Sequence, residues 1–238
     1  MKFIGKERAL FIANKTFDQL IYDISLSEDN KMSYLETAST LSGTIPSGAR
    51  PKDVILVENL KKGFEYVFSK VEQNNFVFDK HTICLLNRLV TSNDNFDNLG
   101  GFRHNGMRIA GSKHTGTKHS NLEFEFSKLI DWYYSSKYDN KPIELFLKLS
   151  KIQPFGDGNK RTAQILMNGL LILDGFCPFT INFKDIKFSI PLVAYYDDEN
   201  EIGKILELML KQQSESLSYF LNEDEIDLFP DNNIELII

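Results

Sequence analysis

The sequence predicts an all-α fold with one small β-hairpin. Apolar residues recur at helical spacing in most of the segments that are free of proline. The alternation of apolar and polar residues that marks a strand occurs in one short stretch, around Met107 and Ile109. The chain has 238 residues, 42% of them hydrophobic, which is enough to bury one substantial core.

The predicted helices follow one another along the chain. The longest covers residues 53–73 and has its apolar face at Ile55, Leu56, Leu60, Phe64 and Val67. Shorter helices with the same spacing are expected at residues 81–90 and 123–134, and a last one at residues 200–217. Helices therefore account for most of the segments with a recognisable pattern.

Two further helices flank a polar loop. Residues 143–152 have an apolar face and begin just after Pro142, a residue favoured in the first turn of a helix. Residues 162–173 are dominated by Ala, Ile, Leu and Met and are followed by Gly175, as expected for a buried helix and its end. Between them lies the run Gln153-Pro-Phe-Gly-Asp-Gly-Asn-Lys-Arg-Thr162.

This run has the composition of a phosphate-binding loop. Gly156 and Gly158 permit positive φ, so the backbone N–H groups between Phe155 and Lys160 can converge on one anion. The N-terminus of the following helix favours phosphate through its free amides and its dipole. Lys160 and Arg161 add positive charge, and a guanidinium can bind two phosphate oxygens at once.

Asp157 adds a possible ligand for a cation. A carboxylate is a hard oxygen ligand, which suits a Mg²⁺ ion that keeps most of its waters and bridges nucleotide phosphates. Taken alone, the Asp-Gly-Asn part of the run is more often a turn that caps a helix. Two better-known nucleotide motifs, G-x-x-x-x-G-K-(S/T) and G-x-G-x-x-G, are absent. The phosphate interpretation therefore depends on the wider pattern.

That wider pattern resembles the Fic family, whose signature is His-Pro-Phe-x-(Asp/Glu)-Gly-Asn-(Gly/Lys)-Arg. Members typically transfer AMP from ATP to a hydroxyl of a target protein. The resemblance covers about residues 35 to 200 and implies a helical Fic core, ATP as donor substrate, Mg²⁺ at Asp157 and an unidentified target protein. It assigns nucleotide contacts to Phe155, Gly156, Gly158, Asn159, Lys160 and Arg161. Asn159 and Arg161 would also belong to the catalytic set.

Residues 101–114 resemble the flap segment of the family, G-x-(Y/F)-R-x-x-x-V-x-I-x-G-S-x-H. In the family this segment forms a β-hairpin over the active site, and an exposed hairpin edge can hold a peptide as an extra strand. The resemblance makes Met107, Arg108 and Ile109 the target-binding flap. Where the family often has two prolines, this chain has Thr115 and Gly116.

Gln153 stands where the family signature has histidine, which resembles a general base acting on the target hydroxyl. A glutamine amide donates and accepts hydrogen bonds but does not titrate, whereas a general base contributes about 10² to 10⁴ in rate. Two hypotheses follow: an impaired protein adenylyltransferase, or an inactive nucleotide-binding or protein-interaction pseudoenzyme of the same fold. A third, transfer of phosphate or of another nucleotide, stays open. His114, in the flap segment, is the alternative base to consider.

Residues 34–44 resemble the inhibitory helix that many Fic proteins carry, with the pattern (S/T)-x-x-x-E-(G/N). In this alignment Ser42 takes the position of the glutamate that, in the family, pairs with the arginine corresponding to Arg161. Serine has no charge, so the inhibitory pairing is expected to be absent. The alternative is that this segment only packs a helix against the core.

A second positive charge is also missing from the phosphate loop. Many AMP-transferring relatives carry another arginine where this chain has Gln164. The charge of a polyphosphate would then be balanced mainly by Lys160, Arg161 and a metal ion.

Composition excludes several classes of protein. A net charge of −6 argues against nonspecific binding of nucleic acid. No stretch approaches the roughly 18 to 20 apolar residues that cross a bilayer, the N-terminus lacks a signal peptide, and two cysteines cannot build a disulfide scaffold. We expect a soluble cytoplasmic protein, with secretion that needs no signal peptide left open. Abundant Asn, Lys and Ile are typical of an AT-rich bacterial genome.

No linker, repeat or low-complexity tract divides the chain. We expect an N-terminal extension at residues 1–50, a Fic core at residues 51–200, and a C-terminal helix with an acidic tail at residues 201–238. From Asn222 to Ile238 the tail has six acidic residues and no Lys or Arg. Two interpretations of it stay open: a solvated tail, or a strip that docks on a partner or on a second subunit in a homodimer.

Overall fold

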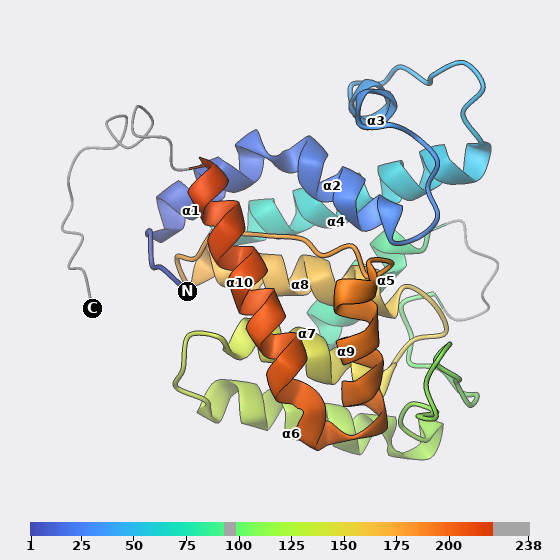
Figure 1. The fold of residues 1–238 in the computed structure, drawn as a ribbon, viewed down its shortest axis with the longest axis vertical. Helices are drawn as coiled ribbons and strands as arrows, with labels where there is room; N and C mark the ends of the chain where they lie inside the picture. Colours follow the sequence, from blue (N-terminus) through green and yellow to red (C-terminus); the bar gives the residue numbers. More distant parts are fainter. Residues whose placement is uncertain (93–98, 221–238) are drawn as a thin grey trace.

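Helix α8 (Asn159–Leu173) forms the centre of the structure, a computed structural model that describes residues 1–92 and 99–220. All but two of its residues are buried, and it packs against α7, α4, α5 and α1. In Figure 1, α8 lies between α4 and α7, α6 lies beyond α7, and α9 and α10 cross in front. The helix that carries the phosphate-loop arginine is thus the most enclosed one.

Within the described residues the secondary structure is helical, apart from one isolated β-bridge between Phe3 and Phe176. The α-helices are α1 (Lys6–Lys15), α2 (Phe17–Leu26), α3 (Tyr34–Leu41), α4 (Pro51–Glu72), α5 (Lys80–Val90), α6 (Leu122–Ser135), α7 (Lys141–Ile152), α8, α9 (Ile186–Asp197) and α10 (Ile202–Phe220). Short 3-10 turns precede α6 (η1, His119–Asn121) and α10 (η2, Glu199–Glu201). The predicted all-α class is confirmed.

The close approach of α8 to its neighbours explains a glycine inside that helix. Gly169 faces Val67 of α4 and Phe76, and a Cβ at this position would clash with both side chains. Glycine costs about 1 kcal/mol relative to alanine in a helix interior, but here it lets the helices pack without a gap. Elsewhere the same core buries large side chains such as Phe64 and Phe146.

The six helices expected from spacing at residues 53–73, 81–90, 123–134, 143–152, 162–173 and 200–217 are all confirmed, within a few residues, as α4 to α8 and α10. The segment at residues 34–44 forms α3, which ends at Leu41. Three helices were not predicted, namely α1, α2 and α9. Helix α9 contains Pro191, which argues against a helix in sequence; the burial of Phe188, Leu192 and Tyr195 offsets its cost.

The β-hairpin predicted at residues 101–114 is wrong for this structure. Between residues 99 and 118 the described chain forms bends and turns and contains no strand. The guanidinium of Arg103 donates to the backbone carbonyl of Asn105 within residues 101–114 and to those of Thr117 and Gln153 outside them. These bonds hold the segment in an irregular, turned conformation. Gly111 and Gly116 have positive φ, which interrupts an extended strand.

One continuous core joins buried residues from Ala9 in α1 to Met209 in α10. The division of the chain at residues 50 and 200 stays a prediction, and the acidic tail from Asn222 lies outside the described residues. Within residues 1–92 and 99–220, none of the helices combines the length and apolar composition that a membrane-spanning segment needs.

Candidate active site

The loop between α7 and α8 turns through two left-handed residues. Gln153, at the end of α7, has φ 51° and ψ 63°, and Gly158, just before α8, has φ 72° and ψ 11°. A Cβ at Gly158 would clash with the Thr91 methyl group, so only glycine fits there. No side chain caps α8, and its first backbone N–H groups therefore stay available to an anion.

Phe155 and Asn159 hold the loop in shape. The Phe155 N–H donates to Asn159 Oδ1 at 2.9 Å, and Asn159 Nδ2 donates back to the Phe155 carbonyl at 2.8 Å. The Phe155 ring is buried and packs edge-on against Phe102, with centroids 5.8 Å apart. The nucleotide contact expected of Phe155 is not supported, because its N–H and its ring are used to fix the loop.

Asn87 of α5 is a supporting residue that the sequence did not reveal. Its Nδ2 donates to the Asp157 carbonyl at 2.9 Å and to Thr162 Oγ1 at 3.2 Å, and its Oδ1 accepts from the Gly100 N–H at 3.2 Å. The side chain is buried. A polar residue on the apolar face of a predicted helix was the only signal, and it ties the loop to α5.

The loop opens onto a cavity of about 330 Å³, which lies within the range of small-molecule sites. Most of the predicted loop residues line it, together with Met107 of the predicted flap, whereas Arg108 and Ile109 do not. The unexpected part of the wall comes from the turn after α2 and from the segment before α9. The lining residues are Ser27, Glu28, Asp29, Met107, Gln153, Gly156, Asp157, Gly158, Asn159, Lys160 and Lys184.

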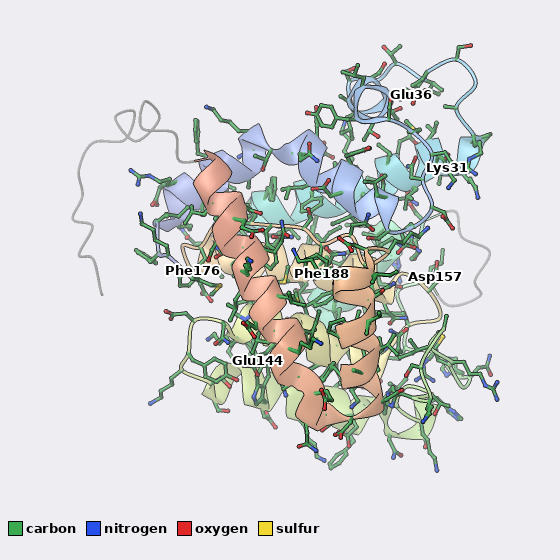
Figure 2. All side chains as sticks on the ribbon, viewed as in Figure 1. Lys31, Glu36, Glu144, Asp157, Phe176 and Phe188 are labelled. Atoms are coloured by element: carbon green, nitrogen blue, oxygen red, sulfur yellow. The ribbon has the colours of Figure 1, made fainter. Side chains whose placement is uncertain are left out.

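Arg161 is the buried cation of this site. Its Nη1 donates to the Val90 carbonyl at 3.0 Å, its Nη2 contacts Asp157 Oδ2 at 2.5 Å, and its Nε lies 3.4 Å from Glu28 Oε2. Only 7% of the arginine side chain is exposed. A buried charge needs such partners, and two carboxylates therefore occupy the guanidinium that was expected to bind phosphate. Asp157 lies where the loop enters α8 (Figure 2).

Gln153 faces the cavity from the end of α7. Its Nε2 donates to the Ser150 carbonyl at 2.5 Å, and its own carbonyl accepts from Arg103 Nε at 2.6 Å. The flap segment approaches closely here, since a Cβ at Gly116 would lie 3.3 Å from Gln153 Cβ. The amide can orient a hydroxyl group in the cavity, but it has no basic site to take a proton.

Part of the chain matches a known protein family. Residues 77–171 match the model of the Fic/DOC family. This segment is a Fic/DOC domain. Over 180 residues the chain is 29% identical to the protein adenylyltransferase Fic of Nematostella vectensis, an alignment that covers 72% of this chain and 41% of that protein. The chain thus spans less than half the length of this curated relative.

Solved structures share the fold of this chain. Fic-1 (residues 134–508) from C. elegans aligns with a TM-score of 0.76 at 18% identity, over 91% of this chain and 67% of that one. A Fic domain containing signaling protein from Bacteroides thetaiotaomicron aligns with a TM-score of 0.70 at 20% identity, over 90% of this chain and 89% of that one. The predicted family and the predicted fold are confirmed.

Ser42, the residue expected at the inhibitory position, lies away from the Fic loop. Ser42 follows α3, is exposed, donates its hydroxyl to the Ser39 carbonyl at 2.8 Å and does not line the cavity. Glu28, after α2, is the residue whose carboxylate faces Arg161. The sequence carried no periodic signal for this contact, because Glu28 lies in a turn far along the chain from its partner.

Polar contacts fix the turn that presents Glu28. The Ser27 hydroxyl accepts from the Phe183 N–H at 3.0 Å, and Arg50 Nη2 donates to the Asp29 carbonyl at 2.9 Å. Asp29 has φ 64°, a left-handed conformation that aspartate tolerates better than most residues. Glu28 is therefore held in place from both sides.

His114 does not enter the cavity of the Fic loop. Its Nε2 lies 3.0 Å from the Lys151 carbonyl, a contact that requires the proton on Nε2. The ring instead lines a second cavity of about 460 Å³, beside Trp132 and Tyr195. The structure gives no support to His114 as a substitute base.

The residues at the Fic loop fit a phosphate-bridged metal ion but not a cage made by protein alone. Among the described residues, no group of three or more His, Cys, Asp or Glu is placed to hold a metal. Asp157 is the loop carboxylate that lines the cavity. Mg²⁺ is usually held by one or two carboxylates together with substrate phosphates, so a single carboxylate is consistent with it.

Proposed function

We propose that this chain binds ATP and Mg²⁺ in the loop cavity as a Fic-type protein adenylyltransferase whose transfer step is severely impaired. One observation carries the proposal: Gln153 faces a cavity formed by the uncapped start of α8 and by Lys160. The site offers donors for phosphate, while the position expected to hold the base holds an amide.

Each residue has a definite role in this proposal. The N–H groups at the start of α8 and the ammonium of Lys160 bind the phosphates, and the Arg161 guanidinium joins them when Glu28 withdraws. Asp157 would hold a Mg²⁺ ion, which would neutralise part of the phosphate charge. Asn159 acts by keeping the loop in shape rather than by touching the nucleotide.

Gln153 limits the reaction with the target. The target hydroxyl must lose its proton as it attacks the α-phosphorus and displaces pyrophosphate. The Gln153 amide can accept a hydrogen bond from that hydroxyl but cannot take the proton. The flap segment, with Met107 on the cavity wall and Arg108 and Ile109 beyond it, would position the target protein. Phosphoryl chemistry depends largely on positioning and charge, so slow transfer persists without the base.

Glu28 sets how readily the nucleotide enters. Its carboxylate lies 3.4 Å from Arg161 Nε and would repel a phosphate placed near the same guanidinium. The inhibitory pairing that Ser42 was expected to lack is therefore assigned to Glu28. Its removal should raise nucleotide affinity.

A second function is favoured by Gln153 itself. A pseudoenzyme that binds nucleotide or protein without transfer needs the loop, Lys160 and Arg161, but no base. One experiment distinguishes the two functions. ATP–Mg²⁺ binding is measured by calorimetry, and AMP transfer is measured with labelled ATP. Both assays use four proteins: the unchanged chain and Gln153→His, each with and without Glu28→Gly.

If Gln153→His restores AMP transfer, either to a target protein or to the chain's own hydroxyl groups, the chain is an enzyme arrested at residue 153. Binding with no transfer by any of the four proteins supports the pseudoenzyme. Absence of ATP binding by all four overturns both the enzyme and the nucleotide-binding pseudoenzyme. The Mg²⁺ requirement, the cytoplasmic location, the lack of nucleic-acid binding and a homodimer stay predictions.

A further inference from the structure

We propose that Lys184 is the second phosphate-binding cation of this site, that it contacts the distal phosphates of a nucleotide di- or triphosphate, and that Asp29 competes with those phosphates for it. The inference rests on the proposed function, because it requires a nucleotide in the loop cavity. Lys184 lies between α8 and α9, outside the loop motif, and lines the cavity together with Lys160.

Gln164 stands where many relatives carry a second arginine, and its buried position means that another residue must supply that positive charge. Gln164 is buried, with 1% of its surface exposed, and its Oε1 accepts from the Ile181 N–H at 3.2 Å. One turn further along α8, Asn168 Oδ1 accepts from the Phe179 N–H at 2.8 Å. The two amides hold the extended segment that leads to Lys184, so Gln164 has no reach into the cavity.

Lys184 is suited to exchange partners. Its ammonium forms an ion pair with Asp29 Oδ1, and 42% of its side chain is exposed. This pairing lowers the pKa of the Asp29 carboxyl. A lysine carries a compact charge on a flexible stem, with three donors that can turn toward a new acceptor. A terminal phosphate carries more negative charge than a carboxylate and competes well for it.

The exchange would also act on Glu28. Asp29 directly follows Glu28, and its ion pair with Lys184 is one of the contacts that hold this turn. When distal phosphates attract Lys184, the turn loses that contact, and Glu28 leaves Arg161 more easily. Binding of the distal phosphates and withdrawal of Glu28 therefore favour each other, which is a linkage between two neighbouring contacts.

The alternative is that Lys184 only stabilises the turn at Glu28 and Asp29 through its ion pair with Asp29. Two substitutions, one at Lys184 and one at Asp29, distinguish the two roles. They shift the ATP affinity in opposite directions in the phosphate-binding role and in the same direction in the stabilising role. If Lys184 binds phosphate, Lys184→Met removes a contact and weakens binding, whereas Asp29→Asn frees Lys184 and strengthens it. If Lys184 only stabilises the turn, both substitutions break the same ion pair and shift the affinity for ATP in the same direction. Asparagine tolerates the left-handed backbone of residue 29, so the second change adds little strain.

The test is calorimetric binding of ATP, ADP and AMP, each with Mg²⁺, to the full chain and to Lys184→Met, Asp29→Asn and Lys31→Met. Lys31 is a matched control, because it also pairs with Asp29, at 3.7 Å, but does not line the cavity. For Lys184→Met we expect ATP and ADP to bind about 5- to 20-fold more weakly and AMP to bind within about twofold of the unchanged chain. Asp29→Asn should bind ATP more tightly, and Lys31→Met should change it by less than about twofold.

Three results overturn the inference alone: unchanged ATP affinity in Lys184→Met, equal losses for ATP and AMP, or shifts of the same sign in Lys184→Met and Asp29→Asn. Failure of the proposed function looks different. In that case neither the unchanged chain nor Glu28→Gly binds ATP at all, and the inference falls with it.

Discussion

The carboxylate of Glu28 lies against the guanidinium of Arg161, with Oε2 3.4 Å from Nε, at the point where the turn after α2 meets the start of α8. Arg161 also pairs with Asp157 at 2.5 Å. The guanidinium that is proposed to join phosphate binding is therefore already paired with two acids. Nucleotide binding must compete with these contacts, and this competition leads to the first prediction.

Glu28→Gly is expected to raise the affinity for ATP–Mg²⁺ by about tenfold, because it removes a carboxylate that both occupies Arg161 and repels phosphate. Calorimetric titration measures the change. Glu58→Gln, an exposed position on α4 away from the cavity, is the control and should leave the affinity unchanged. Equal or weaker binding by Glu28→Gly would show that this carboxylate does not restrain the site.

Gln153→His is expected to raise the rate of AMP transfer by about 10² to 10⁴, since it restores a group that titrates near neutral pH. The rate should increase with pH up to about 7 as the imidazole loses its proton. A labelled-ATP assay measures it. Gln153→Asn, which also tolerates a left-handed backbone but has no base, is the control. Equal rates in the two variants would remove residue 153 from the role of base.

Gly158→Ala is expected to lower the free energy of unfolding by roughly 1 to 3 kcal/mol, because it adds a Cβ at φ 72° and pushes it into Thr91. Urea denaturation measures the loss. Gly203→Ala on α10 is the matched control: its Cβ meets open space, and alanine favours the helix, so stability should be unchanged or rise by up to about 1 kcal/mol. Equal effects at both positions would contradict the steric explanation.

Asp197 is expected to anchor the turn at Ser112 to His114 in a pH-dependent way. The Ser112 hydroxyl and the N–H groups of Lys113 and His114 donate to its carboxylate and lower its pKa. Because the folded-state pKa is depressed, the anchor is fully present above the unfolded-state pKa of about 4 and is lost as pH falls through the lower folded-state value.

Amide chemical shifts of Lys113 and His114 measure this anchor. They should titrate together with a midpoint below about 4, and Asp197→Ala should abolish that titration. A midpoint at or above 4, or a titration that survives Asp197→Ala, would assign the turn to another anchor.

Most helices were predictable because each signal is local. The apolar faces of α4 to α8 recur within single helices, and Gly158 marks the break before α8 through its own backbone requirement. The hairpin was not predictable in the same way. Its strand signal was short, and the guanidinium of Arg103 binds carbonyls within and beyond this segment and so holds it in a turned conformation. Helix α9 was missed because Pro191 argues locally against a helix that tertiary packing stabilises.

The sequence by itself determined the chemical limits of the site: a glycine-bearing loop before a buried helix, an arginine in its first turn, and an amide at residue 153 where a base is expected. Only the tertiary structure decided which charges meet there. Glu28 and Asp29, Asn87, and Lys184 come to the loop from three separate segments, and Ser42 does not. Contacts between distant segments depend on how helices pack, and packing leaves no periodic trace at the polar residues that it brings together.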